Sequence, residues 1–111
     1  MLTDTELLEW LKALAGTGGF RIRPHTTRHM FKEGILERDI VEAVIGKCRM
    51  LERYDEVSRC LVLGYFQLSA NVRAPLHLVF EYSRADAVDI VTAYIPQKPW
   101  WETPWQRGKT K

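Results

Sequence analysis

Two histidines, His25 and His29, are the first candidates for chemistry in this sequence. They fall on the same side of a predicted helix, about one turn from each other. Imidazole titrates near neutral pH, so either side chain is suited to act as a general acid or base. A zinc site would need a third ligand, and no glutamate follows His25 as it does in the helix of a zinc protease. The structural alternative is that His25 caps or hydrogen-bonds within the fold and that His29 is a surface residue.

The tail of the chain, residues 96–111, combines tryptophans with cations. Aromatic planes beside positive charges are suited to stack on the bases of a single-stranded nucleic acid or to anchor a protein interface. They can also fold back and cover a sheet. We expect Trp101 to pack within the fold and Trp100 and Trp105 to remain available for binding. The cations of the tail are Lys98, Arg107, Lys109 and Lys111, against Glu102 alone.

The composition is that of a single globular domain. The chain has 111 residues, of which 46% are hydrophobic and 27% are charged. No apolar run approaches the roughly 20 residues of a membrane helix, and the acidic start does not fit a signal peptide, so we expect a cytoplasmic protein with no membrane partner. Cys48 and Cys60 suit a reducing compartment, where we expect them to be packing thiols.

The net charge of +2 is small, but the positive charge is unevenly distributed. One excess of cations lies in the tail, and another lies in residues 20–34, where Glu33 is the only acidic residue. Local fields of this kind matter more than the net charge in attracting a polyanion. The cations of residues 20–34 are Arg21, Arg23, Arg28 and Lys32.

Three helices are predicted in the first half of the chain. The first should begin with a capping box at Thr3 and is followed by leucines at helical spacing. Pro24 suits the first position of the second helix. Gly34 and Gly46 should end the second and third helices in the left-handed conformation, and these two helices form a helical hairpin. The predicted helices span residues 4–15, 24–33 and 37–45.

The second half of the chain changes to a strand pattern rich in β-branched and aromatic residues. Short connections between the segments imply an antiparallel meander. The expected fold is therefore α+β, with N-terminal helices packed on a four-stranded antiparallel sheet. The predicted strands span residues 48–54, 59–68, 76–82 and 87–95. We divide the single domain, residues 1–111, into an added N-terminal helix (1–19), the helical hairpin with the sheet (20–95) and the tail.

The turn positions predict a register for the sheet. Tyr54 should lie opposite Arg59, and Leu68 opposite Pro75. The register of the last strand stays open, because both of its faces are apolar, and we favour one in which Thr92 and Tyr94 lie beside His77. One face, expected to pack against the helices, then carries Met50, Leu61, Leu63, Tyr65, Leu78, Phe80 and Tyr82. The opposite face carries Cys60, Val62, Gly64, Phe66, His77, Val79 and Glu81, partly covered by the tail.

A longer pattern resembles a known family. The segment HTTRHMFKEGILERDIVEAVIGK, residues 25–47, followed by RCLVLGYF, PLHLVF and VDIVTAYIPQKPWWETPWQRGK, is similar to domain of unknown function family 4258. Its members are small prokaryotic proteins grouped with the RelE-like and BrnT-like toxin superfamily. His29 and Glu33 stand where the family usually has arginines, and Leu36 replaces the usual polar helix cap. The matching positions are His25, Met30, Gly34, Ile35, Asp39, Thr92, Tyr94, Pro96, Trp101 and Arg107.

This resemblance implies a RelE-like fold and metal-independent cleavage of RNA, without a cofactor. In such a reaction a base takes the proton of the 2′-hydroxyl, cations stabilise the pentavalent phosphate and an acid protonates the leaving oxygen. It also implies a cognate antitoxin as a protein partner, as in a type II toxin–antitoxin system. The catalytic candidates are His25, Lys32, Arg59, His77 and Tyr94. The candidate RNA contacts are Arg23, Arg28, Trp100, Trp105 and Arg107.

A second hypothesis keeps the same fold without catalysis. In it the chain is an interaction module that binds a partner protein through the tryptophans of the tail. The missing family arginines favour this hypothesis, whereas the basic segments favour cleavage. Cleavage further requires His25 and Tyr94 to meet at one cleft, and the sheet face away from the helices to stay open.

Overall fold

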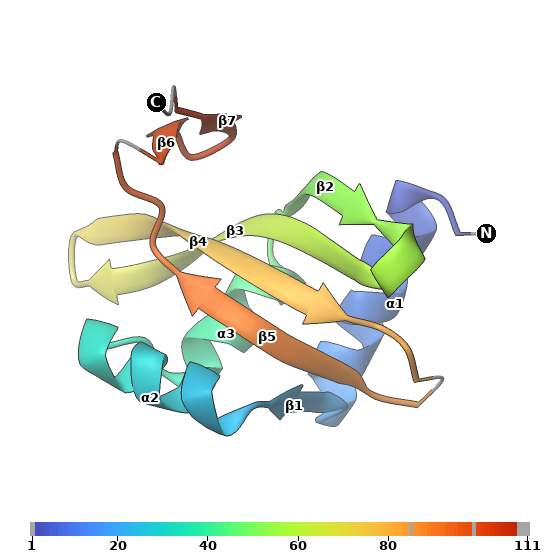
Figure 1. Cartoon of the computed structure of the whole chain (residues 1–111). Coiled ribbons are helices and arrows are strands. Elements are labelled where there is room, and N and C mark those ends of the chain that lie inside the picture. The colour runs from blue at the N-terminus through green and yellow to red at the C-terminus, as the bar shows by residue number, and fades with distance from the viewer. Residues whose placement is uncertain (1, 85, 99, 109–111) are drawn as a thin grey trace.

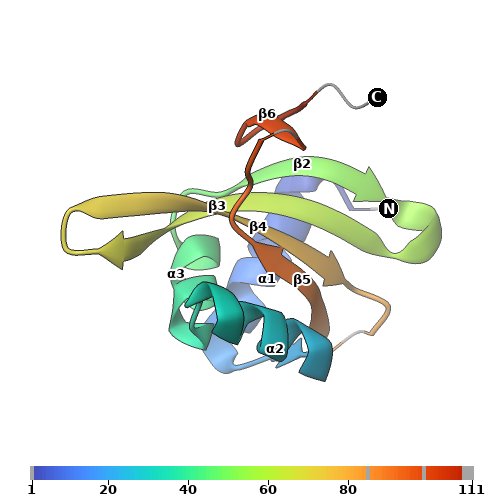
Figure 2. The same ribbon diagram turned by 60° about the vertical axis from the view of Figure 1, so that its left-hand side comes forward.

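The computed structural model describes residues 2–84, 86–98 and 100–108, and shows an α+β fold in three layers. Helices cover one face of a five-stranded mixed sheet, and a small two-stranded hairpin formed by the tail lies on the other face (Figures 1 and 2). The helices are α1 (Asp4–Thr17), α2 (Pro24–Glu33) and α3 (Glu37–Ile45), and a short 3-10 helix spans Asp55–Val57.

The helix boundaries follow the predicted signals, with one exception. Thr3 caps α1 through its side chain, and Gly34 ends α2 in the left-handed conformation at φ 74°. Gly46, in contrast, has φ −76° and is extended, so the predicted left-handed cap of α3 is wrong. The ammonium of Lys12 takes over the capping: its Nζ donates to the carbonyl oxygens of Val44 at 2.7 Å and Gly46 at 2.5 Å. A cation at these unpaired carbonyls also favours the helix dipole.

The sheet contains one strand more than predicted. Its strands are β1 (Phe20–Ile22), β2 (Arg49–Tyr54), β3 (Arg59–Ser69), β4 (Val72–Glu81) and β5 (Val88–Tyr94), in the order β1-β5-β4-β3-β2. β2 to β5 pair antiparallel as expected, but β1 pairs parallel to β5, so the sheet is mixed. This short segment leads directly into α2, which packs on β5, and it therefore lies along the free edge of β5.

The predicted register is right at one turn and wrong at the next. Tyr54 lies opposite Arg59, but Pro75 lies opposite Tyr65 rather than Leu68. The shift of three positions is odd, and it therefore turns β3 over. The tight turn between Ser69 and Val72 accounts for two of these positions, and the β-bulge between Gln67 and Ser69 adds the third, which inverts the strand. Cys60, Val62, Gly64 and Phe66 consequently face the helices, and Leu61, Leu63 and Tyr65 face the tail.

The layer between helices and sheet is apolar. Phe66 and Phe80 are almost completely buried there, together with leucines and isoleucines from the helices and strands. Position 64 requires glycine for a steric reason, because a Cβ there would lie 2.5 Å from the carbonyl oxygen of Ala43 in α3. The buried Cys60 thiol packs in the same layer, where burial raises its pKa to about 12. Both cysteines are free thiols.

The tail forms the hairpin of β6 (Trp101–Thr103) and β7 (Gln106–Arg107). Figure 2 shows this hairpin above the sheet, on the side away from α1, α2 and α3. Lys109 and Lys111, two of the predicted tail cations, lie outside the described residues. Of the helices in the described part of the chain, none combines the length and apolar character needed to cross a membrane.

Candidate functional site

His77 attaches the tail hairpin to the sheet. Its side chain is fully buried, with Nδ1 3.0 Å from the Tyr94 hydroxyl and Nε2 2.6 Å from the carbonyl oxygen of Pro104. A carbonyl oxygen only accepts, so we assign the ring proton to Nε2, and Nδ1 then accepts from the hydroxyl. Burial lowers the pKa of His77, which favours this neutral form. Tyr94 also lies opposite His77 in the sheet, as predicted.

Trp101 and Arg107 complete the attachment. The Trp101 ring meets the His77 ring edge-on, with centroids 4.3 Å apart, and is 4% exposed. The Arg107 guanidinium lies 4.8 Å from the centre of that tryptophan ring. It also forms a bidentate pair with Glu52 of β2, at 2.7 and 2.8 Å, and these hydrogen bonds lower the pKa of Glu52. Two predictions are confirmed: Trp101 packs within the fold, and the tail covers part of the sheet face away from the helices.

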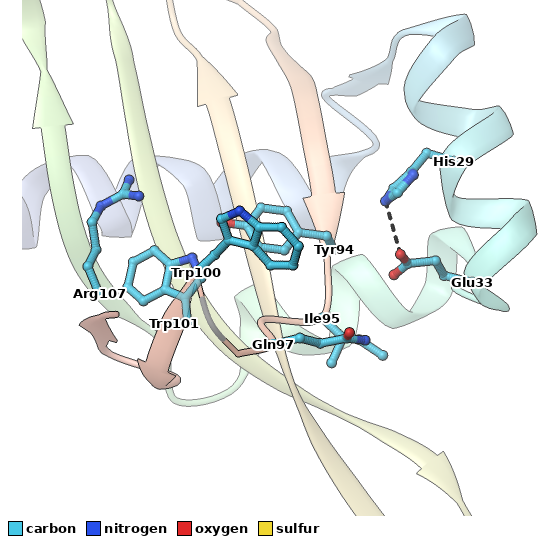
Figure 3. A pocket seen from close by; sticks show the side chains of 8 residues that line it. All are labelled: His29, Glu33, Tyr94, Ile95, Gln97, Trp100, Trp101 and Arg107. Atoms are coloured by element: carbon cyan, nitrogen blue, oxygen red, sulfur yellow. Dashed lines mark ion pairs between the residues drawn. The ribbon is translucent and has the colours of Figure 1, made fainter. Parts of the chain in front are cut away.

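An open cavity of about 450 Å³ lies between α2 and the tail hairpin, over the end of β5. Figure 3 shows its lining: Trp100 and Trp101 stand near Tyr94, and His29 and Glu33 face them from α2. Trp100 is 64% exposed, so one of its ring faces is available to a ligand. We call this space the helix-side cavity. The side chains lining it are His29, Glu33, Tyr94, Ile95, Gln97, Trp100, Trp101 and Arg107.

His29 and Glu33 form the titratable wall of this cavity. They are four positions apart on α2, and His29 Nε2 lies 3.2 Å from Glu33 Oε2. The second carboxylate oxygen, Oε1, is buried and has no hydrogen-bond partner among the described residues. A buried acceptor without a donor is costly, and a donor supplied by a ligand would satisfy it. α2 is fixed against β5 by Thr26, whose buried hydroxyl donates to the Val91 carbonyl oxygen at 2.6 Å.

The structure brings together part of the predicted site. Tyr94, Trp100 and Arg107 line the helix-side cavity. His25 is exposed and lines a smaller adjoining cavity of about 230 Å³ with Thr92, and His29 borders both spaces. His25 and His29 are about 6 Å apart along the helix axis, given its rise per residue. The histidine of the larger cavity is therefore His29, one turn beyond the predicted residue. The predicted meeting of His25 and Tyr94 at one cleft is wrong, because the two side chains line different spaces. The tail hairpin also covers part of the sheet face that cleavage was expected to need open.

Other predicted residues lie elsewhere or are already paired. Arg59 is 3.9 Å from Glu81, opposite it across the β3–β4 ladder. Four strand positions separate Glu81 from His77, or about 13 Å, so Arg59 does not join the histidine. Arg23 pairs with Glu81 and with Asp89, the latter at 3.2 Å.

The remaining predicted residues are exposed or buried without joining a catalytic cluster. Lys32 and Arg28 are exposed on α2 and do not line the helix-side cavity. His77 has no ring nitrogen available to a substrate, because both are hydrogen-bonded in a buried position. We therefore assign His77 to holding the Tyr94 hydroxyl in place and not to contact with a substrate.

The acid–base pair of the cavity, His29 and Glu33, belongs to neither predicted set. The sequence allows His29 to be either an acid or base or a surface residue, and it marks Glu33 only as a departure from the family pattern. The available signal was their spacing, because residues four apart on a helix are neighbours and a carboxylate can orient an imidazole. Trp105, the other exposed tryptophan, lies away from this cavity and lines a separate groove near β2 and β3.

Within residues 2–84, 86–98 and 100–108, no three histidine, cysteine or acidic side chains gather closely enough to hold a metal ion. Comparisons of the chain with models of protein families, with curated proteins and with solved structures gave no match in any of the three.

Proposed function

We propose that this chain is a toxin-like protein of a type II toxin–antitoxin system, a RelE-like endoribonuclease that cleaves RNA without a metal ion and is neutralised by a cognate antitoxin. The observation that carries the proposal is the helix-side cavity, in which an imidazole paired with a carboxylate faces aromatic rings, of which that of Trp100 is exposed. The family resemblance supports the same assignment through Tyr94, Trp101 and Arg107.

The cavity supplies the parts needed to bind one nucleotide. The exposed face of Trp100 is suited to stack on a base, because every base has a π face. Arg107 supplies positive charge at the wall, although Glu52 shares it. The unpaired Oε1 of Glu33 is an acceptor for an amino group of the base or for a ribose hydroxyl.

The proposed reaction is an internal transesterification. His29 takes the proton of the 2′-hydroxyl, and Glu33 holds the imidazole and stabilises its positive charge. The 2′-oxygen bonds to phosphorus, and the bond from phosphorus to the 5′-oxygen breaks. The Tyr94 hydroxyl releases its hydrogen bond to His77 Nδ1 and gives its proton to that leaving oxygen. Burial raises the pKa of Tyr94, so its hydroxyl is protonated at neutral pH. The products are a 2′,3′-cyclic phosphate and a 5′-hydroxyl, and water returns the proton from His29 to Tyr94.

The second hypothesis, a non-catalytic interaction module, is favoured by one specific observation. Of the three arginines expected to contact RNA, Arg23 and Arg107 are paired with carboxylates, and only Arg28 forms no ion pair with a described residue. In that function Trp100 would anchor a partner protein instead of a base.

Induced expression with and without substitutions separates the two hypotheses. The proposal expects growth arrest, and expects the purified protein to cleave RNA in EDTA and leave cyclic-phosphate ends. His29→Ala should lower the cleavage rate about 10²- to 10⁴-fold, as expected for loss of a general base. Tyr94→Phe should also lower it, whereas the matched variant His25→Ala should retain most activity. Harmless expression, with intact RNA after incubation with folded protein, would overturn the proposal.

A further inference from the structure

A second groove lies on the other side of the tail hairpin. It has a volume of about 250 Å³ and is lined by the segment between α3 and β2, by β2 and β3, and by Trp105 at the turn of the hairpin. The helix-side cavity lies over β5, whereas this groove lies over β3 and β2, toward the other edge of the sheet. We call it the strand-side groove. Its lining residues are Lys47, Cys48, Arg49, Leu63, Tyr65 and Trp105.

The charge of the strand-side groove differs from that of the cavity. Its lining contains two cations and no carboxylate side chain. Lys47 and Arg49 are exposed, and neither forms an ion pair with a described residue. Arg107 in the helix-side cavity, in contrast, is bound to Glu52. The positive charge of the groove is therefore unpaired among the described residues, whereas that of the helix-side cavity is paired with Glu52.

Aromatic rings accompany these cations. Trp105 is 49% exposed, and the partly buried Tyr65 stands in the same groove. Cations alone would suit any acidic surface, but cations beside exposed aromatic rings fit a chain that alternates phosphates with planar bases. Among polyanions, a single-stranded RNA has this combination.

We propose that the strand-side groove is a second subsite for the RNA strand whose reacting nucleotide occupies the helix-side cavity. The strand crosses the tail hairpin, with one base on Trp100, another on Trp105, and phosphates at Lys47 and Arg49. This inference rests on the proposed function and adds the path of the substrate. It also gives the hairpin a role, because the fixed β6–β7 unit separates the two exposed tryptophans.

The test is the affinity for RNA as a function of length and salt. Oligonucleotides of about 2 to about 16 nucleotides cover the usual size of a single-strand site. Their 2′-O-methyl groups prevent cleavage, so binding is measured alone by fluorescence anisotropy. Affinity should rise with length until the strand spans both subsites and then level off. A Lys47→Gln/Arg49→Gln variant should abolish this rise and flatten the slope of log K against log salt by about 1.4, or about 0.7 for each phosphate that the protein no longer neutralises.

Matched variants separate the subsite from general effects of charge and surface. Arg38→Gln/Arg84→Gln removes the same charge from two exposed residues outside both spaces and should leave binding unchanged. Trp105→Ala should weaken binding of long oligonucleotides about 5- to 150-fold and leave short ones unaffected. Phe31→Ala, which removes an 86% exposed ring from α2, should have no effect.

The outcomes distinguish this inference from the proposed function. Short oligonucleotides that bind through Trp100, without gain from length or loss from the groove variants, would overturn the second subsite alone. Polyglutamate that binds the groove as tightly as RNA of equal charge would also overturn it, because stacking would then contribute nothing. Absence of binding at every length would overturn both proposals.

Discussion

The two faces of the sheet are covered in physically different ways. The helix face is sealed by apolar side chains, with Phe66, Phe80 and Leu78 almost fully buried. The opposite face is covered by a small hairpin that is attached mainly by polar contacts, through His77 and the pair of Arg107 with Glu52. The first layer depends on the hydrophobic effect, and the second depends on hydrogen bonds and charge.

This difference separates the part that folds the chain from the part suited to binding. Apolar burial is insensitive to modest changes of pH or salt, whereas a buried imidazole and a surface ion pair respond to both. Both exposed tryptophans of the hairpin segment, the open cavity and the groove lie along the polar attachment. Substitutions on the helix face should therefore lower the stability of the whole fold, whereas substitutions on the opposite face should mainly loosen the hairpin.

The largest effect is expected on the helix face. Phe80→Ala leaves a cavity in a fully buried position and should lower the free energy of unfolding by about 3–5 kcal/mol. Val79→Ala, at the next position of the same strand but on the opposite face, is the matched control and should cost less. Denaturant unfolding measures both. Equal losses would contradict the distinction between the two faces.

The next largest effect is expected at the attachment of the hairpin. His77→Phe keeps a ring of similar size but leaves the Tyr94 hydroxyl and the Pro104 carbonyl oxygen without their partner. Each unpaired buried group costs about 1–3 kcal/mol, and opening the hairpin to water relieves that cost. Hydrogen exchange should therefore accelerate in residues 101–107 while the sheet stays protected. Tyr94→Phe removes only one of the two contacts and should accelerate exchange less.

The sequence predicts the parts of the fold that local signals determine. The capping residue Thr3, the left-handed Gly34 and the antiparallel order of β2 to β5 follow from local chemistry, and they were predicted correctly. The orientation of β3 was not, because its residues are apolar on both faces and alternation gives no preference. The turn between Ser69 and Val72 and the β-bulge between Gln67 and Ser69 together decide that strand, and the one extra residue of the bulge inverts it.

The site was predictable in part for the same reason. The pairing of His77 with Tyr94 is the favoured one of the registers that the sequence leaves open for β5. The choice between His25 and His29 depends on how α2 is rotated against β5, which the Thr26 hydrogen bond fixes and the sequence does not reveal. The ion pairs of Arg23 with Glu81 and Asp89 join residues that are remote in sequence, so the sequence does not predict them either.

A smaller loss of stability is expected when the pH falls. Burial lowers the pKa of His77 below its ordinary value of 6.5. The hydrogen bond to the Pro104 carbonyl oxygen and the charge of Glu52 oppose this shift, and the charge of Arg107 adds to it. Between the two values the unfolded chain binds more protons than the folded one. Stability is therefore fully present above about pH 6.5 and falls as the pH drops through the window, by at most about 1.4 kcal/mol per pH unit from this residue.

Comparison with His77→Phe isolates this contribution. Hydrogen exchange in residues 101–107 should accelerate in the wild-type protein as the pH falls below 6.5, after correction for the intrinsic dependence of exchange on pH. The variant should show no such added acceleration, because it has no imidazole beneath the hairpin. The same acceleration in both proteins would assign the effect to other groups.

The smallest effect on stability, and the one that sharpens the choice of function, is expected at Arg107. Its side chain is 58% exposed, so its ion pair with Glu52 should contribute only about 0.2–1 kcal/mol and should weaken in salt. A double-mutant cycle of Arg107→Gln and Glu52→Gln, read from denaturant unfolding, measures this coupling free energy. A small value means that a phosphate can displace Glu52 from the guanidinium at little cost, as RNA cleavage in the helix-side cavity requires. A coupling well above about 2 kcal/mol would instead assign Arg107 to holding the hairpin, and would favour the non-catalytic interaction module.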